Sequence, residues 1–249
     1  MEVKKKNKNI IIIIENLNWE IIMARFSRLK TLTTMIEVGV IPVFYNGTIE
    51  IAQNIIKACA DGGATCIEMT NRGDMAIDVF RELEMYSKVH KPEVILGAGS
   101  IVDSSTAALY INLGANFIVG PVLDEETAIL CNKRKIPYCP GCGSATEIQG
   151  AHSLGVEFCK VFPGAQVGGP AFVKAMLGPC PWTSIMPTGG VGNDKESLYE
   201  WFKAGVACVG IGSELITKEI IKNKDYKKLA DDVRRVVGLI REIREELRK

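Results

Sequence analysis

The chain has 249 residues, 47% of them apolar, which suits either one large α/β barrel or two smaller domains with a sizeable core. Its 30 Lys and Arg residues nearly balance its 29 Asp and Glu residues, leaving a formal net charge of +1. This balance excludes a global electrostatic case for binding nucleic acid, a membrane surface or another polyanion, so any anion must be bound locally.

Residues 1–22 begin with a basic stretch and an isoleucine run, which resembles the start of a secretory signal. Glu15, Asn16 and Asn18 interrupt the apolar part, which is too short for a signal core or a membrane span. We expect residues 1–22 to form an extension that is weakly ordered or docked on the surface, and residues 23–249 to form one domain.

Short apolar segments alternate with amphipathic segments of helical length from about residue 24 onward. We expect a helix first, at about 25–38, in a position to cover the floor of a barrel. The candidate strands then follow in chain order: IPVFYN (41–46), TCIEMT (65–70), VILGAGS (94–100), NFIVGPV (116–122), IPYCPG (136–141), FCKVFPG (158–164), SIMPTGG (184–190) and CVGIGS (208–213). Several intervening segments open on Asp, Ser or Thr and close on Gly, as helix caps predict.

Strand and helix repeat roughly every 20 to 25 residues, which is typical of parallel βαβ units. Eight such units predict an α/β fold, a (β/α)₈ TIM barrel with an extra N-terminal helix. A doubly wound open sheet is the alternative, but it would usually show a glycine-rich turn after the first strand, where this chain has only Gly47. The charged tail at 218–249 has apolar residues at helical spacing, which predicts a helix on the outside of the barrel.

A lysine interrupts the apolar strand at 158–164. Alternation places Lys160 on one face of its strand with Phe158 and Phe162. It places Glu68 on one face of the second strand with Cys66 and Thr70. If both faces point inward, the two side chains meet over the barrel mouth. A buried lysine is readily shifted towards its neutral amine, which can form a Schiff base with a ketone while a carboxylate moves the proton. The alternative is a Lys160–Glu68 ion pair that only fills the barrel.

Glycine pairs follow the last two candidate strands. Gly189 and Gly190 end the seventh, and Gly212 precedes Ser213 at the end of the eighth. Barrels frequently bind phosphate here through backbone N–H groups, and glycine lets the backbone approach the anion. The two motifs together therefore predict a phosphate site.

Other motifs favour no second chemistry. His90 and His152 are the only histidines, too few for a multi-histidine metal site or a convincing histidine-driven triad. Cys139 and Cys142 form a C-x-x-C, but no second pair stands at zinc spacing, so we expect no metal site. Lys174 is expected to be a solvated helix lysine. The eight cysteines lie mostly in apolar runs, which favours reduced thiols and a cytoplasmic location.

With these residues in view, the chain resembles the 2-keto-3-deoxy-6-phosphogluconate (KDPG) and 4-hydroxy-2-oxoglutarate (KHG) aldolases from about residue 26 to 215. The likeness rests on four motifs: GGATCIEMTNRG, GAGS, CKVFPG and PTGG. It implies a class I enzyme with a trimeric barrel and no metal or organic cofactor. Residue by residue it implies Lys160 as the Schiff-base lysine and Glu68 as the acid and base. It also implies that Arg72 and Ser100 hold the pyruvate carboxylate, that Pro121 and Phe162 line the pocket, and that Gly189, Gly190 and Ser213 hold the phosphate.

The chain departs from the family pattern in several places. Ser100 stands where threonine is usual, and Asn71 where a more apolar residue is common. The first strand ends in Tyr45 and Asn46, where many members carry a basic residue. The CPGCGS run at 139–144 also differs from the family's usual run, in which Pro-Gly is followed by small or apolar residues and threonine. These departures leave the lysine chemistry intact and bear on the identity of the substrate.

The resemblance implies a cytoplasmic homotrimer that cleaves a phosphorylated keto acid, KDPG, to pyruvate and glyceraldehyde 3-phosphate, with KHG as a second substrate. A phosphosugar isomerase or epimerase on the same barrel remains an alternative, although it would not need a lysine on the sixth strand. A non-catalytic sugar-phosphate binding protein is the other alternative, in which Lys160 stays protonated as the partner of a carboxylate.

Overall fold

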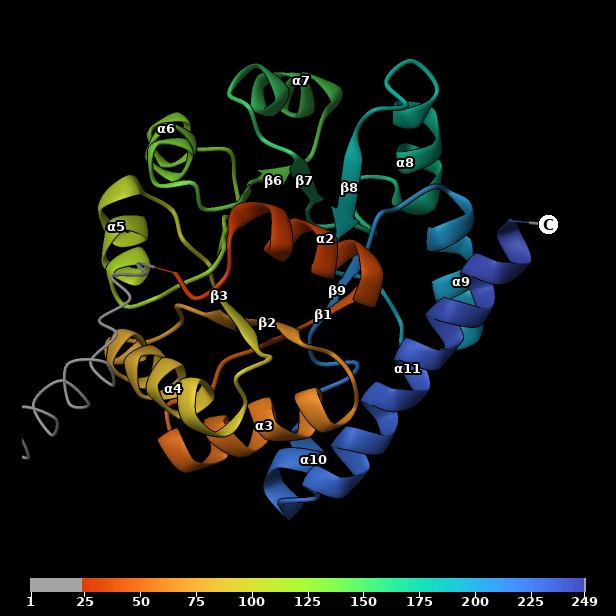
Figure 1. Ribbon diagram of the computed structural model, residues 1–249. Helices are drawn as coiled ribbons and strands as arrows, with labels where there is room; N and C mark the ends of the chain where they lie inside the picture. Colours follow the sequence, from red (N-terminus) through yellow and green to blue (C-terminus); the bar gives the residue numbers. More distant parts are fainter. Residues whose placement is uncertain (1–23, 249) are drawn as a thin grey trace, which may run out of the picture.

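In the computed structural model, which describes residues 24–248, parallel strands alternate with helices along the chain (Figure 1). The strands are β1 (Val40–Phe44), β2 (Cys66–Thr70), β3 (Ile95–Gly99), β4 (Ile118–Val119), β5 (Tyr138–Cys139), β6 (Gly141–Cys142), β7 (Phe158–Val161), β8 (Ser184–Pro187) and β9 (Val209–Ile211). The helices are α2 (Arg28–Val38), α3 (Ile49–Asp61), α4 (Ala76–His90), α5 (Ser104–Asn112), α6 (Glu125–Arg134), α7 (Ala145–Ser153), α8 (Gly169–Leu177), α9 (Lys195–Lys203), α10 (Lys218–Asn223) and α11 (Tyr226–Leu247).

All strand pairs are parallel, and the strands form two sheets, ordered β5-β4-β3-β2-β1-β9 and β6-β7-β8. Every predicted strand is present, but the fifth is divided at Pro140, which has no backbone N–H to donate to a ladder. A bridge between Thr188 and Gly210 connects the sheets on the other side. Neighbouring strands follow chain order, so the sheet curls instead of reversing at a central strand as a doubly wound sheet does.

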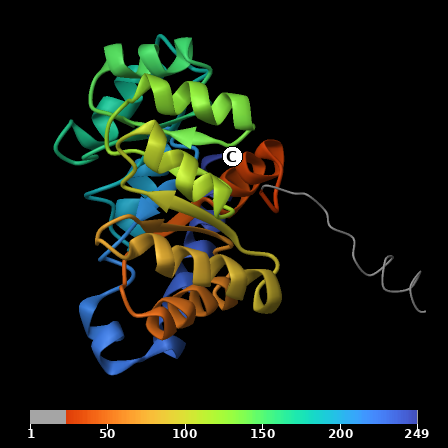
Figure 2. The same ribbon diagram turned by 90° about the vertical axis from the view of Figure 1, so that its left-hand side faces the viewer.

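Helix α2 covers the end of the curled sheet at which the strands begin, as predicted for the first helix. The Ser27 side chain accepts a hydrogen bond from the Lys30 N–H at its start, and Gly39 ends it at φ 78°. Its side chains Leu32 and Met35 belong to an apolar cluster, the floor cluster. The other members lie in the strands or directly before them: Ile41, Cys66, Ile95, Phe117, Val119, Cys139, Phe158, Met186 and Cys208. Figures 1 and 2 show α2 lying across one end of the strands.

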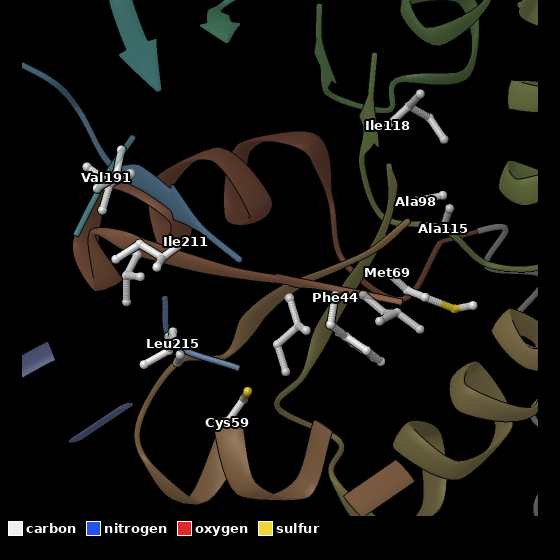
Figure 3. Packing of buried hydrophobic residues seen from close by; sticks show 14 of the residues in the cluster. Phe44, Cys59, Met69, Ala98, Ala115, Ile118, Val191, Ile211 and Leu215 are labelled. Atoms are coloured by element: carbon white, nitrogen blue, oxygen red, sulfur yellow. The ribbon is translucent and has the colours of Figure 1, made fainter. Parts of the chain in front are cut away.

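A second and larger apolar layer lies between the strands and the surrounding helices. Figure 3 shows part of it, where Cys59 of α3 points toward the strand side chains, Phe44 among them. The C-terminal helix belongs to this layer, because α11 packs against α3 and α9. Of its six apolar residues at helical spacing, Leu229, Val233, Val236, Ile240 and Ile243 are buried, and Val237 is half-buried. The tail differs from the single predicted helix because it is divided, with Lys224 at φ 53° after α10.

Within residues 24–248, no helix is long and apolar enough to cross a membrane. The extension expected at residues 1–22 lies outside the described residues. His90 is the last residue of α4.

The floor cluster predicts a sharp contrast between two neighbouring residues of α2. Met35 is fully buried, whereas Ile36 is 45% exposed. Met35→Ala should lower the free energy of unfolding by about 3 kcal/mol, because it leaves a cavity under the barrel interior. Ile36→Ala is the matched control and should change it by less than about 0.5 kcal/mol. Urea unfolding measures both, and equal losses would show that α2 does not pack as described.

Candidate active site

The two ionisable residues predicted to meet are both buried inside the curled sheet. Lys160 on β7 is 5% exposed and Glu68 on β2 is 1% exposed. Lys160 pairs in register with Met186, whose side chain belongs to the floor cluster. Since paired residues of a parallel ladder point to the same face, Lys160 also points inward, one layer above Phe158. Cys159 and Val161 belong to the outer layer, as the alternation predicts.

The electrostatics of this interior raise the pKa of the buried Glu68 carboxyl group. Burial raises the pKa of Glu68 above 4.5, and the positive charges of Lys160 and Arg72 only partly oppose that rise. No direct ion pair or hydrogen bond joins Lys160 to Glu68 within residues 24–248, so the space-filling ion pair considered above is not the arrangement found. The Lys160 Nζ instead lies over the Phe162 ring, 4.7 Å from its centroid.

Two glycines of β3 make room for the interior side chains. A Cβ atom on Gly99 would overlap the Glu68 carboxylate, and one on Gly97 would overlap the Phe117 ring. The GAGS motif therefore has a packing role that the sequence did not reveal. It lets a glutamate and a phenylalanine occupy an interior that side chains of β3 would otherwise fill.

Arg72 and Ser100, predicted to bind one carboxylate together, are in contact. The Arg72 Nε donates a hydrogen bond to the Ser100 Oγ at 3.2 Å. Ser100 has φ 58°, in the left-handed region that non-glycine residues rarely adopt. Such backbone strain is concentrated at functional sites.

The turn that carries Arg72 is fixed by residues that sequence reasoning missed. The Tyr110 hydroxyl donates to the Asn71 Oδ1 at 2.9 Å, and the Asn71 N–H donates to the Gly99 carbonyl at 2.7 Å. The Tyr45 hydroxyl packs so closely on Gly73 that a Cβ there would overlap it. Asn71 and Tyr45 were visible as departures from the family pattern, but no sequence signal pointed to Tyr110 on α5.

A cavity of about 970 Å³ opens at the carboxyl ends of the strands. Six of the predicted site residues lie on its wall: Arg72, Phe162, Gly189, Gly190, Gly212 and Ser213. Lys160, Glu68 and Ser100 are not among the wall residues, but Lys160 contacts Phe162 and Ser100 contacts Arg72, both of which are. Pro121 is not on the wall, because its carbonyl packs against Gly141 of β6.

The glycines of the wall have the conformations that an anion cradle needs. Gly189 and Gly190 have φ 88° and 77°, and a Cβ on Gly190 would overlap the Cβ of Ala165. In the described part of the chain, the N–H groups of Gly190 and Ser213 make no backbone hydrogen bond. Free N–H groups on a concave surface are suitable donors for an anion.

The C-x-x-C motif and the histidines do not build another site. Both Cys139 and Cys142 are buried and free. A hydrogen bond with Cys159, together with burial, raises the pKa of the Cys142 thiol, which opposes formation of a reactive thiolate. Among residues 24–248, no three His, Cys, Asp or Glu side chains gather where they could hold a metal ion. Lys174 is exposed on α8, as expected.

Comparison with known proteins gives consistent matches over most of the chain. The family model described as "KDPG and KHG aldolase" matches residues 32–231. The 2-dehydro-3-deoxy-phosphogluconate aldolase of Pseudomonas aeruginosa is 32% identical over 197 residues, spanning 78% of this chain and 85% of that protein. The enzyme of the same name from Haemophilus influenzae is 29% identical over 205 residues, spanning 82% and 94%.

A solved structure supports the same relationship. KDPG aldolase from Legionella pneumophila, crystallised with pyruvate captured as a covalent carbinolamine intermediate, is 29% identical. It superposes with a TM-score of 0.76, covering 83% of this chain and 97% of that one. The described fold is therefore the α/β fold of these proteins, with a curled parallel sheet.

The raised pKa of Glu68 predicts a pH-dependent stability. The folded protein binds this proton more tightly than the unfolded chain, so the associated stabilisation is complete below the ordinary pKa of 4.5 and is lost as the pH rises through the folded value. The glutamine of Glu68→Gln does not titrate, so this variant does not lose stability in that way. Its free energy of unfolding should therefore gain on wild type as the pH rises above 4.5.

Urea unfolding at several pH values measures this difference. Glu242→Gln, at an exposed position of α11, is the control and should follow the wild-type profile. A constant difference between Glu68→Gln and wild type across the range would contradict the burial effect.

Proposed function

The chain belongs to the KDPG and KHG aldolase family and is an aldehyde-lyase, and from this premise we propose how its residues perform the reaction. The protein is a class I aldolase that cleaves 2-dehydro-3-deoxy-6-phosphogluconate to pyruvate and glyceraldehyde 3-phosphate. The observation that carries the residue assignment is the burial of Lys160 inside the sheet, within electrostatic reach of Glu68.

Lys160 supplies the nucleophile. Its neutral amine attacks the C2 ketone of the substrate, and uptake of a proton with loss of water from the resulting carbinolamine leaves an iminium ion. The iminium is an electron sink, so the electron pair of the C3–C4 bond moves towards it when that bond breaks. The products of this step are an enamine bound to Lys160 and free glyceraldehyde 3-phosphate.

Glu68 moves the protons. As a carboxylate it removes the proton of the C4 hydroxyl during cleavage, and as an acid it returns a proton to C3 of the enamine. Water then hydrolyses the iminium to pyruvate and regenerates the amine. Burial suits Glu68 to both roles because a raised pKa makes the carboxyl group easier to protonate than one in water.

The substrate is held at both ends. Arg72 and Ser100, already joined by a hydrogen bond, present a donor pair for the pyruvate carboxylate. Phe162 lines the cavity beside Lys160, and Pro121 is proposed to line the substrate pocket with it. Gly189, Gly190, Gly212 and Ser213 bind the phosphate, and this binding energy positions C2 beside Lys160.

The alternatives explain less of the site. A phosphosugar isomerase or epimerase would use the phosphate cradle, but its reaction would not need a buried lysine at position 160. A binding protein that pairs Lys160 with a carboxylate would not need a buried glutamate near it. KHG, which is cleaved to pyruvate and glyoxylate, fits the same lysine chemistry as a second substrate without using the phosphate cradle.

We extend the proposal to the assembly and its location. The two sheets are interpreted as one closed (β/α)₈ barrel, supported by the continuity of β5 and β6 through Pro140 and by the Thr188–Gly210 bridge. A homotrimer is proposed from the family resemblance, and light scattering would test it against the 27.2 kDa mass of one chain. A cytoplasmic location is proposed because all eight cysteines are free.

Pyruvate and borohydride should together add one reduced pyruvate to Lys160, because reduction traps the imine. Intact mass followed by peptide mapping locates the adduct. Lys160→Ala should abolish both the adduct and cleavage, whereas Lys174→Ala, at a solvated lysine of α8, should label as wild type does. An adduct mapped to any other lysine would refute the assignment.

Glu68→Gln should separate imine formation from proton transfer. It keeps the shape of the side chain but removes the proton acceptor, so exchange of pyruvate methyl protons with solvent should fall by roughly 10² or more. Slow imine formation should persist. Proton NMR in heavy water follows the exchange, and a near-normal rate in this variant would mean that another group moves the proton.

A further inference from the structure

The phosphate end of the cavity extends beyond the glycines to helix α10. Two lysines of this helix, Lys218 and Lys222, lie on the cavity wall together with Ser213. They are four residues apart, a spacing that places both side chains on one face of a helix. The cavity is therefore bounded at this end by two ammonium groups that the sequence motifs did not single out.

These two lysines are not engaged elsewhere. Within residues 24–248 neither forms an ion pair, whereas two lysines shortly after them do. Lys227 pairs with Asp231 at 2.7 Å, and Lys228 pairs with Asp232 at 2.9 Å. The charges of Lys218 and Lys222 are thus available to a ligand in the cavity.

The backbone that carries them is fixed. The Thr217 side chain accepts a hydrogen bond from the Ile220 N–H at the start of α10, and Ile220 is buried beneath the helix. Ile221 also lines the cavity, between the two lysines. The ammonium groups are therefore mobile only through their own side chains, which suits them to follow a phosphate at the cavity mouth.

The charges of the wall show why these lysines matter. Besides them, the charged residues on the wall are Arg72, which bonds Ser100 at the carboxylate end, and Glu214, next to Ser213. Backbone N–H groups carry only partial charges, so the glycine cradle alone would hold a phosphate dianion beside an opposing carboxylate. Lys218 and Lys222 reverse the sign of the local field.

We propose that Lys218 and Lys222 bind the phosphate of the substrate and set the preference for phosphorylated over unphosphorylated 2-keto-3-deoxygluconate. This inference rests on the proposed function, because it assigns a substrate group to the same site. It makes α10 the specificity element of the enzyme, separate from the lysine and glutamate that do the chemistry.

The test compares kcat/KM for the two substrates in Lys218→Gln, Lys222→Gln and the double variant. Each single change should lower the ratio of phosphorylated to unphosphorylated kcat/KM by roughly threefold, and the double change by on the order of tenfold, mainly through KM for the phosphorylated substrate. Glu214→Gln should raise the ratio, because it removes the opposing charge. Lys174→Gln, an exposed helix lysine off the cavity, is the matched control and should keep the wild-type ratio.

Ionic strength provides an independent reading. Added potassium chloride should raise the wild-type KM for the phosphorylated substrate more than it raises that of the double variant, because salt screens exposed charges. Melting temperatures near wild type would exclude misfolding as the cause of a lowered ratio.

A double variant with the wild-type ratio and salt response would overturn the inference. That failure is distinguishable from failure of the proposed function, which would show as a wild-type protein that gains no pyruvate adduct at Lys160 under borohydride.

Discussion

The burial of a lysine and a glutamate in one apolar interior, without an ion pair between them in the described chain, is the feature on which the rest of the structure depends. Charged groups in such a place are expensive unless something compensates them. Here the Phe162 ring faces the Lys160 ammonium, and protonation becomes easier for Glu68. The floor cluster under α2 keeps this interior closed below, so the two groups meet ligands only from the carboxyl ends of the strands.

The parallel arrangement separates chemistry from recognition. Lys160 and Glu68 lie in the interior, Arg72 and Ser100, which we propose bind the substrate carboxylate, lie at the ends of β2 and β3, and the glycines proposed to bind phosphate follow β8 and β9. A substrate bound at both ends is positioned for reaction by contacts remote from the bond that breaks. On the proposed assignments, changes on α10 are expected to alter which substrate is accepted without altering the lysine chemistry.

Periodic patterns in the sequence predicted where the strands lie and which of their side chains face inward. Alternation placed Phe158 and Lys160 on the inner face, and spacing placed all the strands, but it did not foresee the division at Pro140. Contacts between distant segments escaped it, because neither the Tyr110–Asn71 hydrogen bond nor the packing of Tyr45 on Gly73 leaves a local pattern. The role of Pro121 came from the motif match alone and stays a prediction; its carbonyl packs against Gly141.

A crystal of the protein soaked with pyruvate would test the central claim most directly. The account predicts continuous electron density from the Lys160 Nζ to C2 of pyruvate, with the pyruvate carboxylate bound by Arg72 and Ser100 and the Glu68 carboxyl group facing the bound methyl carbon. Pyruvate bound without a covalent bond to Lys160, or joined to a different lysine, would contradict it.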